Sequence, residues 1–347
     1  MSRTIARPRV VITHWVHPEV IELLAAHCEV IANPKRETWP RESVLKVARD
    51  ADAAIMFMPD RVDDSFLAEC PRLEVIAAAL KGYDNFDVAA CTRRCVWLTC
   101  VPDLLTVPTA ELAIGLLLAI TRRMPEGDDH IRGGGFQGWR PELYGQGLTG
   151  RTIGFIGLGA VGRAIAERLA AWHVRMVYAD PVAAPPATER HCGLVRVSLD
   201  ELLASSDFVL PLLHLKPDTH HLLDARALAR VKQGTYVINV GRGSLVDEAA
   251  IAESLASGHL AGYAADVFEM EDWALDARPR AIHAALLADR ARTFLTPHLG
   301  SAVDSVRRDI ALEAAENVLD VLLRSVRPRG AVNTVSGKGS SPRRHCG

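Results

Sequence analysis

The sequence predicts an α/β fold built from two domains, each with a parallel sheet. The chain has 347 residues, which is too long for one small core and fits two domains of ordinary size. Short apolar runs typical of buried strands alternate with segments whose apolar residues recur at helical spacing. This alternation favours parallel sheets covered by helices. Hydrophobic residues make up 49% of the chain, so a large core can form.

The first block contains three expected strands and at least one expected helix. Strands are predicted over residues 10–13, 53–58 and 73–78, and the spacing of apolar residues predicts a helix over 17–28. The block ends at the prolines of residues 102–108, where the chain turns toward a different segment.

A strongly apolar helix is expected next, over residues 109–121, and a glycine-rich stretch over 133–144 reads as an ordered arm. A second α/β block then starts at residue 151. Strands are expected at 152–156, 174–179, 208–213, 235–240 and 262–268. Helices are expected at 160–171 and 305–323, and a short helix is expected after the capping box Ser198–Glu201. The last helix is expected to return to the first block.

Composition excludes several classes of protein. A net charge of −2 gives no overall attraction to nucleic acid or to acidic membranes. The longest apolar stretch, residues 112–120, is too short to span a bilayer, and no signal peptide is visible, so a cytoplasmic location is expected. The seven cysteines include no Cys-x-x-Cys pair, so no metal site is expected. Residues 336–347 are expected to be disordered.

A glycine-rich segment follows the strand expected at residues 152–156. Gly157, Gly159 and Gly162 are spaced as Gly-x-Gly-x-x-Gly, and a helix is expected to begin among them. In such a turn the first glycine permits the sharp bend, the second lets a pyrophosphate approach the backbone, and the third lets helix and strand pack closely. The spacing alone is weak evidence. With a strand before it and a helix after it, it predicts a dinucleotide site in a Rossmann-like domain.

Asp180 ends the next expected strand, at the spacing from the glycines that ribose recognition requires. A carboxylate at this position accepts hydrogen bonds from the ribose hydroxyls of NAD and disfavours the 2′-phosphate of NADP. No arginine directly follows Asp180, so we expect NAD as the cofactor. The alternative is an aspartate that only caps a loop.

Three ionisable groups follow later strands. Arg242 comes after the strand at residues 235–240, at a sheet edge where ligands bind, and its guanidinium can bind an oxyanion through two hydrogen bonds. Glu271 and His298 come after two further strands, and pairing them would fix the imidazole tautomer and create a proton-handling dyad. Taken singly, the arginine also fits a surface salt bridge and the acidic residues fit a solvated loop.

These residues together resemble the D-2-hydroxyacid dehydrogenase family. The order that carries the resemblance is Gly157–Gly162, Asp180, Arg242, Glu271 and His298. The resemblance extends from residue 10 to about residue 333. It implies an NAD-dependent oxidoreductase in which the arginine binds the substrate oxyanion and the glutamate–histidine pair handles the proton.

The same resemblance implies a domain arrangement and a partner. The first domain would be discontinuous and bind substrate, with residues 1–104 and 299–335, while residues 105–298 would form the NAD-binding Rossmann domain. The chain would form a homodimer through the helix at 109–121 and the following arm. Implied cofactor contacts are Thr109, Gly157, Gly159, Ala160, Val161, Gly162, Asp180, Leu213, His214, Leu215, Val240, Gly241, Arg242, Asp266 and Gly300.

One segment departs from the family pattern. Members of the family usually have proline where this chain has His214, and Pro211 lies inside the same expected strand. How His214 contacts the cofactor therefore stays open.

Several segments are most similar to one branch of the family, the phosphite-oxidising phosphonate dehydrogenases. They are residues 57–62, 79–85, 101–109, 136–139, 266–273 and 298–303. The resemblance implies oxidation of phosphite to phosphate with hydride transfer to NAD. His298 would be the base and Glu271 would orient it, with Arg242 as a rival base.

Lys81 is the most specific marker of that branch. Carboxylate-specific relatives have a small or apolar residue there, before the glycine that corresponds to Gly82. Phosphite is largely a dianion near neutral pH, so an added cation would help to bind it; Arg307 is a candidate third cation. The resemblance also assigns Met58, Gly82, Trp139, Tyr144 and Ser301 to the substrate pocket. Lys81 and Arg307 could instead be exposed surface residues.

Two other functions compete with phosphite oxidation. The first is an ordinary D-2-hydroxyacid dehydrogenase that acts on a small carboxylate, against which Lys81 argues. The second is an NAD-sensing binding protein, against which the complete set of Arg242, Glu271 and His298 argues, because a sensor does not need all three for turnover.

Overall fold

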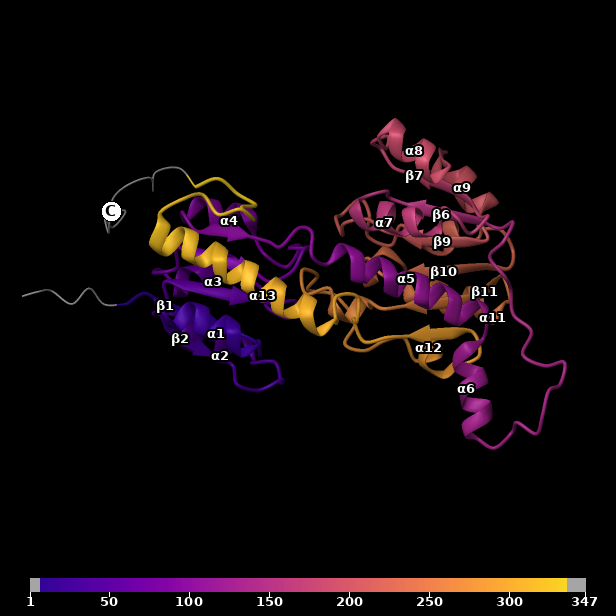
Figure 1. Ribbon diagram of the computed structural model, residues 1–347, viewed down its shortest axis with the longest axis horizontal. Coiled ribbons are helices and arrows are strands. Elements are labelled where there is room, and N and C mark those ends of the chain that lie inside the picture. The colour runs from indigo at the N-terminus through magenta and orange to yellow at the C-terminus, as the bar shows by residue number, and fades with distance from the viewer. Residues whose placement is uncertain (1–6, 336–347) are drawn as a thin grey trace, which may run out of the picture. The chain divides into compact units, whose positions relative to one another are not determined.

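A computed structural model describes residues 7–335 of the chain, which divides into two compact units (Figure 1). One unit takes in the chain up to Leu105 and again from Val303, and the other runs from Thr106 to Ala302. The breaks expected after residues 104 and 298 lie near these boundaries. The expected disordered tail at residues 336–347 lies outside the described residues.

The first unit contains a five-stranded sheet in the order β2-β1-β3-β4-β5, and all its pairings are parallel. The strands are β1 (Arg9–Ile12), β2 (Glu29–Ala32), β3 (Ala53–Met56), β4 (Val75–Ala78) and β5 (Trp97–Thr99). The helices are α1 (Pro18–Ala25), α2 (Arg41–Ala48), α3 (Asp64–Glu69), α4 (Val88–Arg93) and α13 (Asp304–Leu319), and α13 continues as a π-helical turn at Asp320–Arg324.

Helices cover both faces of this sheet, because alternate strand residues point to opposite sides. Val10 and Ile12 of β1 pack in a cluster with residues of α1 and α13, whereas Val11 belongs to a second cluster with residues of α2, α3 and α4. The face of α13 that enters the first cluster is rich in alanine, including Ala311 and Ala315. These small side chains let the C-terminal helix lie close to the sheet and complete the discontinuous unit.

The second unit contains a seven-stranded sheet in the order β12-β11-β10-β9-β6-β7-β8, again with parallel pairings. The strands are β6 (Thr152–Ile156), β7 (Arg175–Ala179), β8 (Leu194–Arg196), β9 (Phe208–Pro211), β10 (Thr235–Asn239), β11 (Leu260–Ala265) and β12 (Thr293–Leu295). The α-helices are α5 (Thr106–Thr121), α6 (Met124–Arg132), α7 (Ala160–Leu169), α8 (Pro186–Cys192), α9 (Leu199–Ser205), α10 (Ala225–Leu228), α11 (Glu248–Ala256) and α12 (Ala284–Ala288).

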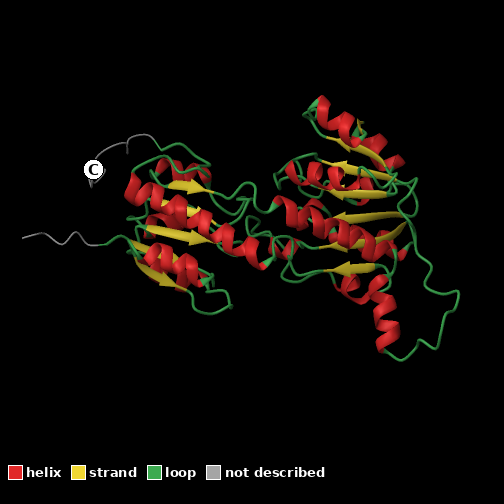
Figure 2. Cartoon of the chain, in the orientation of Figure 1, coloured by secondary structure: helices red, strands yellow, loops and turns green. Residues whose placement is uncertain are grey.

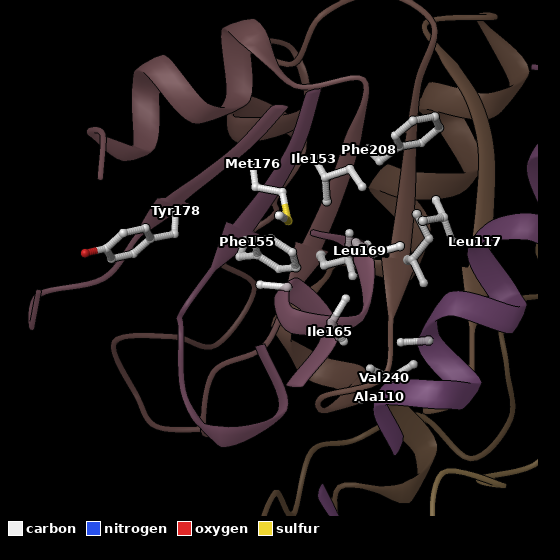
Figure 3. Packing of buried hydrophobic residues seen from close by; sticks show 14 of the residues in the cluster. Ala110, Leu117, Ile153, Phe155, Ile165, Leu169, Met176, Tyr178, Phe208 and Val240 are labelled. Carbon is white, nitrogen blue, oxygen red and sulfur yellow. The ribbon is translucent and has the colours of Figure 1, made fainter. Parts of the chain in front are cut away.

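The core of this unit also lies on both faces of its sheet. On one face, Phe155 of β6 packs with Leu117 of α5 and Ile165 of α7, as Figure 3 shows. On the other face, Val209 and Val237 pack with residues of α9, α10 and α11. The prediction of two α/β blocks with parallel sheets is confirmed.

Several details differ from the sequence prediction. Strands β2, β5, β8 and β12 were not expected, and three of them have only three residues. The segment expected as an arm is preceded by α6 and remains a loop that extends away from the sheet (Figure 2). No helix among residues 7–335 is long and apolar enough to cross a membrane.

Candidate active site

The glycine turn connects β6 to α7, and each glycine has a separate structural reason. Gly157 has a φ of +88°, and a Cβ there would lie 2.6 Å from Cδ2 of Leu213. Gly162 faces the carbonyl oxygen of Gly157, which a Cβ would approach to 3.2 Å. Gly159 caps α7, and a Cβ there would meet nothing within 4 Å. The open space lies at the glycine that a pyrophosphate must approach, so the turn fits a dinucleotide.

Asp180 follows β7 and is tied to the glycine turn. Its Oδ2 accepts a hydrogen bond from the backbone N–H of Leu158 at 2.9 Å, and its Oδ1 accepts from that of Val182 at 2.8 Å. These bonds aim the carboxylate at the site, and each oxygen keeps a further lone pair for a ribose hydroxyl. Asp180 also lines a pocket of about 630 Å³ together with Leu213, a size suited to a small ligand or part of a cofactor.

Arg242 follows β10, where the buried side chain of Asn239 shapes the turn. The Asn239 Nδ2 donates to the carbonyl oxygen of Arg242 at 2.8 Å, and its Oδ1 accepts from the N–H of Gly241 at 3.1 Å. The Arg242 Nη1 donates to the carbonyl oxygen of Gly241 at 3.0 Å. The turn therefore holds the guanidinium at the carboxyl edge of the sheet.

Asp266 follows β11 and braces the loop after β12. Its carboxylate accepts hydrogen bonds from Thr296 Oγ1 at 2.6 Å and from the N–H groups of Leu299 at 2.6 Å and Gly300 at 2.8 Å. Burial raises the pKa of Asp266, against the opposing effect of these donors. The carboxylate therefore fixes the backbone on both sides of His298, and its expected contact with the cofactor stays a prediction.

His298 and Glu271 form a direct pair. The imidazole Nδ1 lies 2.7 Å from Oε2 of the glutamate, whose Oε1 accepts the N–H of Phe268 at 3.0 Å. His298 adopts a left-handed backbone conformation with φ of +55°, a strained geometry for a residue with a Cβ. The side chain of His298 is one-third exposed. Because Nδ1 is held by the carboxylate, Nε2 remains for proton exchange with a substrate.

The site residues of this unit lie at one edge of its sheet. The glycine turn, Asp180, Arg242, Asp266 and His298 come after the carboxyl ends of β6, β7, β10, β11 and β12 in that order. In a parallel sheet these ends meet at the same edge. The predicted placement of Arg242 and the predicted Glu271–His298 pair are therefore seen in the structure.

In the first unit, the candidate substrate residues follow neighbouring strands. Met58 comes after β3, and Lys81 and Gly82 come after β4, which pairs with β3. Lys81 is half-buried, which argues against an ordinary surface lysine. Arg307 lies on the first turns of α13, and burial lowers its pKa.

His14 stands beside Arg307 at this edge, and sequence reasoning missed it. It follows β1, its ring centroid lies 5.2 Å from that of Phe57, and the guanidinium of Arg307 lies 5.7 Å from the same phenyl ring. Burial and the charge of Arg307 lower the pKa of His14 to about 4. A polar residue directly after a buried strand was the signal that could have found it.

Trp139 and Tyr144 are not brought to the site of their own unit. Both are exposed, at 83% and 71%, on the arm between α6 and β6. The arm follows α6 and leads to the amino end of β6, and the backbone N–H of Gln146 donates to the carbonyl oxygen of Thr121 at the C-terminal end of α5. Within this unit they lie at the opposite ends of the strands from the dinucleotide edge, and their expected place in the substrate pocket stays a prediction.

The remaining predicted contacts occupy the loops of the second unit. Gly300 approaches Thr109 of α5, whose Oγ1 would lie 3.2 Å from a Cβ on the glycine. Leu213 packs against Gly157, and the carbonyl oxygen of His214 accepts from Thr219 Oγ1 at 2.7 Å. Helix α7 begins with Ala160 and Val161, and the turn to Arg242 contains Val240 and Gly241. The loop after β9 contains Leu215, and the loop after β12 contains Ser301.

Comparisons with known proteins agree with this geometry. Residues 114–300 match the family model described as the D-isomer specific 2-hydroxyacid dehydrogenase, NAD binding domain. A glyoxylate reductase of Thermococcus kodakarensis is 35% identical over 318 residues, which cover 90% of this chain and 92% of that protein. A glyoxylate reductase of Aeropyrum pernix is 36% identical over the same shares of both chains.

The chain belongs to the D-isomer specific 2-hydroxyacid dehydrogenase family. Its second unit is the NAD-binding domain of that family, so the chain is an NAD-dependent oxidoreductase and NAD is its cofactor, as the sequence predicts. The glycine turn and Asp180 are the residues that would hold it. The relatives above are named glyoxylate reductase and not phosphonate dehydrogenase, so the comparisons do not support the phosphite branch.

Solved structures of other proteins share the fold. A Thermus thermophilus protein superposes with a TM-score of 0.84 at 34% identity, covering 94% of this chain and all of that one. An NADPH-dependent glyoxylate/hydroxypyruvate reductase from Sinorhizobium meliloti, in complex with NADP and malonate, has a TM-score of 0.80 at 27% identity and covers 97% of this chain.

Arg196 is a second residue near the NAD site that sequence reasoning missed. It is the last residue of β8, and its side chain donates to the carbonyl oxygens of Asp180 and Pro181. Arg196 does not directly follow Asp180 in the sequence, and it lies beside Asp180 only because β8 pairs with β7.

Proposed function

We propose that the chain interconverts a small 2-oxo acid such as glyoxylate and the corresponding 2-hydroxy acid, using NADH and NAD. The observation that carries the proposal is the 2.7 Å pair of His298 and Glu271, at the same sheet edge as the dinucleotide turn. A histidine ordered by a carboxylate is the group that a reversible alcohol–carbonyl conversion needs. The names of the relatives support the substrate class.

His298 would handle the proton. In reduction, Nε2 of the protonated imidazole gives a proton to the carbonyl oxygen as that oxygen gains negative charge; in oxidation, neutral Nε2 takes the hydroxyl proton. Glu271 keeps the proton on the nitrogen that faces it in the neutral form and stabilises the imidazolium that forms. The nicotinamide supplies the hydride donor or acceptor.

Arg242 would bind the carboxylate of the acid. Its planar guanidinium can donate two parallel hydrogen bonds to a carboxylate. The turn built by Asn239 limits the motion of the backbone that carries it. Binding the substrate through its charged end leaves the reacting carbon free to meet the hydride.

Phosphite is the second candidate substrate, and the cations of the first unit favour it. Lys81 and Arg307 are both half-buried, and Arg307 lies beside Phe57, so neither is an ordinary surface charge, and two added cations suit a dianion. The reaction would be phosphite plus NAD plus water giving phosphate, NADH and a proton. Hydride leaves phosphorus, water oxygen bonds to it, and His298 takes a proton from the water.

One assay with two arms separates the candidates. In the first arm, NADH and glyoxylate are supplied and loss of NADH absorbance is followed with glycolate formation. In the second, NAD and phosphite are supplied and NADH and phosphate are measured. Turnover in the first arm alone supports the 2-oxo acid, and turnover in the second alone replaces it with phosphite. No turnover in either arm would refute both substrate assignments.

We also propose a homodimer formed through α5 and the arm. Phe136, Trp139 and Tyr144 expose large aromatic surfaces on that arm, at 56%, 83% and 71%, and such a group of side chains is typical of a surface covered by a partner. Sedimentation velocity should give the mass of two chains; the mass of one chain would reject the proposal.

A further inference from the structure

The pocket beside Asp180 contains one positively charged side chain, Arg196, as well as the carboxylates of Asp180 and Glu201. Its walls include Ile156, Ala179, Asp180, Pro181, Arg196 and Leu213. Asp180 is tied to the glycine turn through Leu158, which marks the pocket as the adenosine end of the dinucleotide site. The adenosine ribose is the part of the cofactor where NAD and NADP differ, so every charge in this pocket bears on the choice between them.

Arg196 is held at this place by backbone oxygens. Its strand pairs with β7 so that Arg196 lies opposite Tyr178. Nη2 donates to the carbonyl oxygen of Asp180 at 2.8 Å and to that of Pro181 at 2.7 Å, and Nε donates to the Asp180 carbonyl oxygen at 3.1 Å. These three bonds fix the guanidinium against the turn that carries the selective aspartate.

The bonds do not neutralise the guanidinium. Both acceptors of the three bonds are uncharged carbonyl oxygens, and within residues 7–335 the ion pairs of the structure give Arg196 no carboxylate partner. By contrast, the Asp180 carboxylate accepts two backbone N–H groups. A fixed cation and a fixed anion therefore flank one turn, and the cation is the group that a phosphate would bind.

We infer that Arg196 is a second determinant of cofactor choice, which binds the 2′-phosphate of NADP and offsets part of the rejection by Asp180. The chain then binds NADP measurably, although it prefers NAD. Removing Asp180 leaves the arginine unopposed and shifts the preference toward NADP. The inference depends only on the NAD site and not on which acid or oxyanion is the substrate.

Measuring the equilibrium binding of NADH and NADPH in the absence of substrate tests the role of Arg196. Fluorescence titrations with NADH and with NADPH are made on the wild-type chain, on Asp180→Ser, on Arg196→Gln and on the double variant. Loss of a charge-assisted hydrogen bond should weaken NADPH binding by about tenfold in Arg196→Gln, with NADH changed by less than about twofold. Asp180→Ser should tighten NADPH binding by about tenfold, and Arg196→Gln in that background should remove most of the gain.

Two comparisons distinguish phosphate binding from support of the turn. Arg196→Lys keeps the charge and should retain part of the NADPH affinity that Arg196→Gln loses. Added salt should weaken NADPH binding more than NADH binding in the wild type, and the two equally in Arg196→Gln. Equal weakening of both cofactors by Arg196→Gln, or no weakening of either, would overturn the inference.

Discussion

His298 and Glu271 lie 2.7 Å apart, Nδ1 to Oε2, although 27 positions separate them in the chain. The loop after β11 supplies the glutamate and the loop after β12 supplies the histidine, and the two strands pair side by side. Asp266 connects the loops a second time through the N–H groups of Leu299 and Gly300. The pair is therefore part of the framework of the sheet edge and does not depend on a bound substrate.

Replacing the dyad should lower turnover without lowering cofactor affinity. His298→Asn is expected to reduce kcat by 10²- to 10⁴-fold, because general acid–base catalysis contributes about that much. Glu271→Gln keeps the shape but not the charge and should cost less. The double variant should lose about as much as His298→Asn alone, since the residues act as a unit. Additive losses in the double variant would show that the two residues act separately. Weaker NADH binding in His298→Asn would show that the histidine also supports the cofactor.

Two glycine substitutions should separate folding from cofactor binding. Gly159→Ala places its methyl in open space, so the free energy of unfolding should barely change while NADH affinity falls at least about tenfold. Gly157→Ala meets Leu213 and keeps a positive φ, so it should lower the unfolding free energy by about 1–3 kcal/mol. Urea unfolding and NADH titration measure both. Unchanged NADH affinity in Gly159→Ala would mean that no pyrophosphate approaches this turn.

Lys81 is expected to act on the substrate and not on the cofactor. Lys81→Ala should raise KM for the anion that is turned over by about tenfold or more, with a larger rise for phosphite than for glyoxylate. The affinity for NADH should stay within about twofold. Lys46→Ala is the matched control, because Lys46 is exposed on α2 of the same unit. A KM equal to that of the control would make Lys81 a structural residue.

Asp60 should make stability fall as pH rises from about 4 to about 6. Burial raises the pKa of this carboxyl from 3.8 to about 6, although Thr13 and the N–H of Phe57 donate to it. Between these values the folded chain binds more protons than the unfolded chain, so raising the pH lowers the unfolding free energy, by about 1–3 kcal/mol. Asp60→Asn should remove this dependence.

The measurement is urea unfolding of both proteins across that pH range. His14, whose pKa falls to about 4, contributes the opposite trend, so the comparison uses the difference between wild type and Asp60→Asn. Asp50→Asn serves as control because Asp50 is exposed on the same unit. Parallel curves for wild type and Asp60→Asn would contradict the assignment.

The sequence predicted the long elements and the dinucleotide turn, because both have local signals. β6 and the start of α7 agree with the prediction to the residue, since a buried strand, three glycines and a helix stand in one short segment. β8 and β12 were missed because three residues cannot show a periodicity. They become strands only by pairing with β7 and β11.

The sequence predicted those site residues that directly follow a strand with a clear apolar pattern. It did not predict residues whose role depends on neighbours that are distant in the chain. Arg242 and Glu271 could be placed at one edge because each follows an expected apolar strand, whereas the strand before His298 was missed. Arg196 depends on the pairing of β8 with β7, and His14 acquires its environment from Arg307, far along the chain. Neither the pairing of β8 with β7 nor the proximity of Arg307 to His14 can be read from the local sequence, although the position of His14 after a buried strand was a signal for a polar residue at the sheet edge.

Transfer of an isotopic label tests direct hydride exchange between nicotinamide and substrate. The chain is given glyoxylate with NADH deuterated at nicotinamide C4 and, in parallel, NAD with phosphite deuterated at phosphorus; the products are analysed by mass spectrometry. The account predicts deuterium in glycolate or, for the second candidate, in NADH, with transfer strongly slowed in His298→Asn. Product without deuterium in both arms, or no product at all, would contradict it.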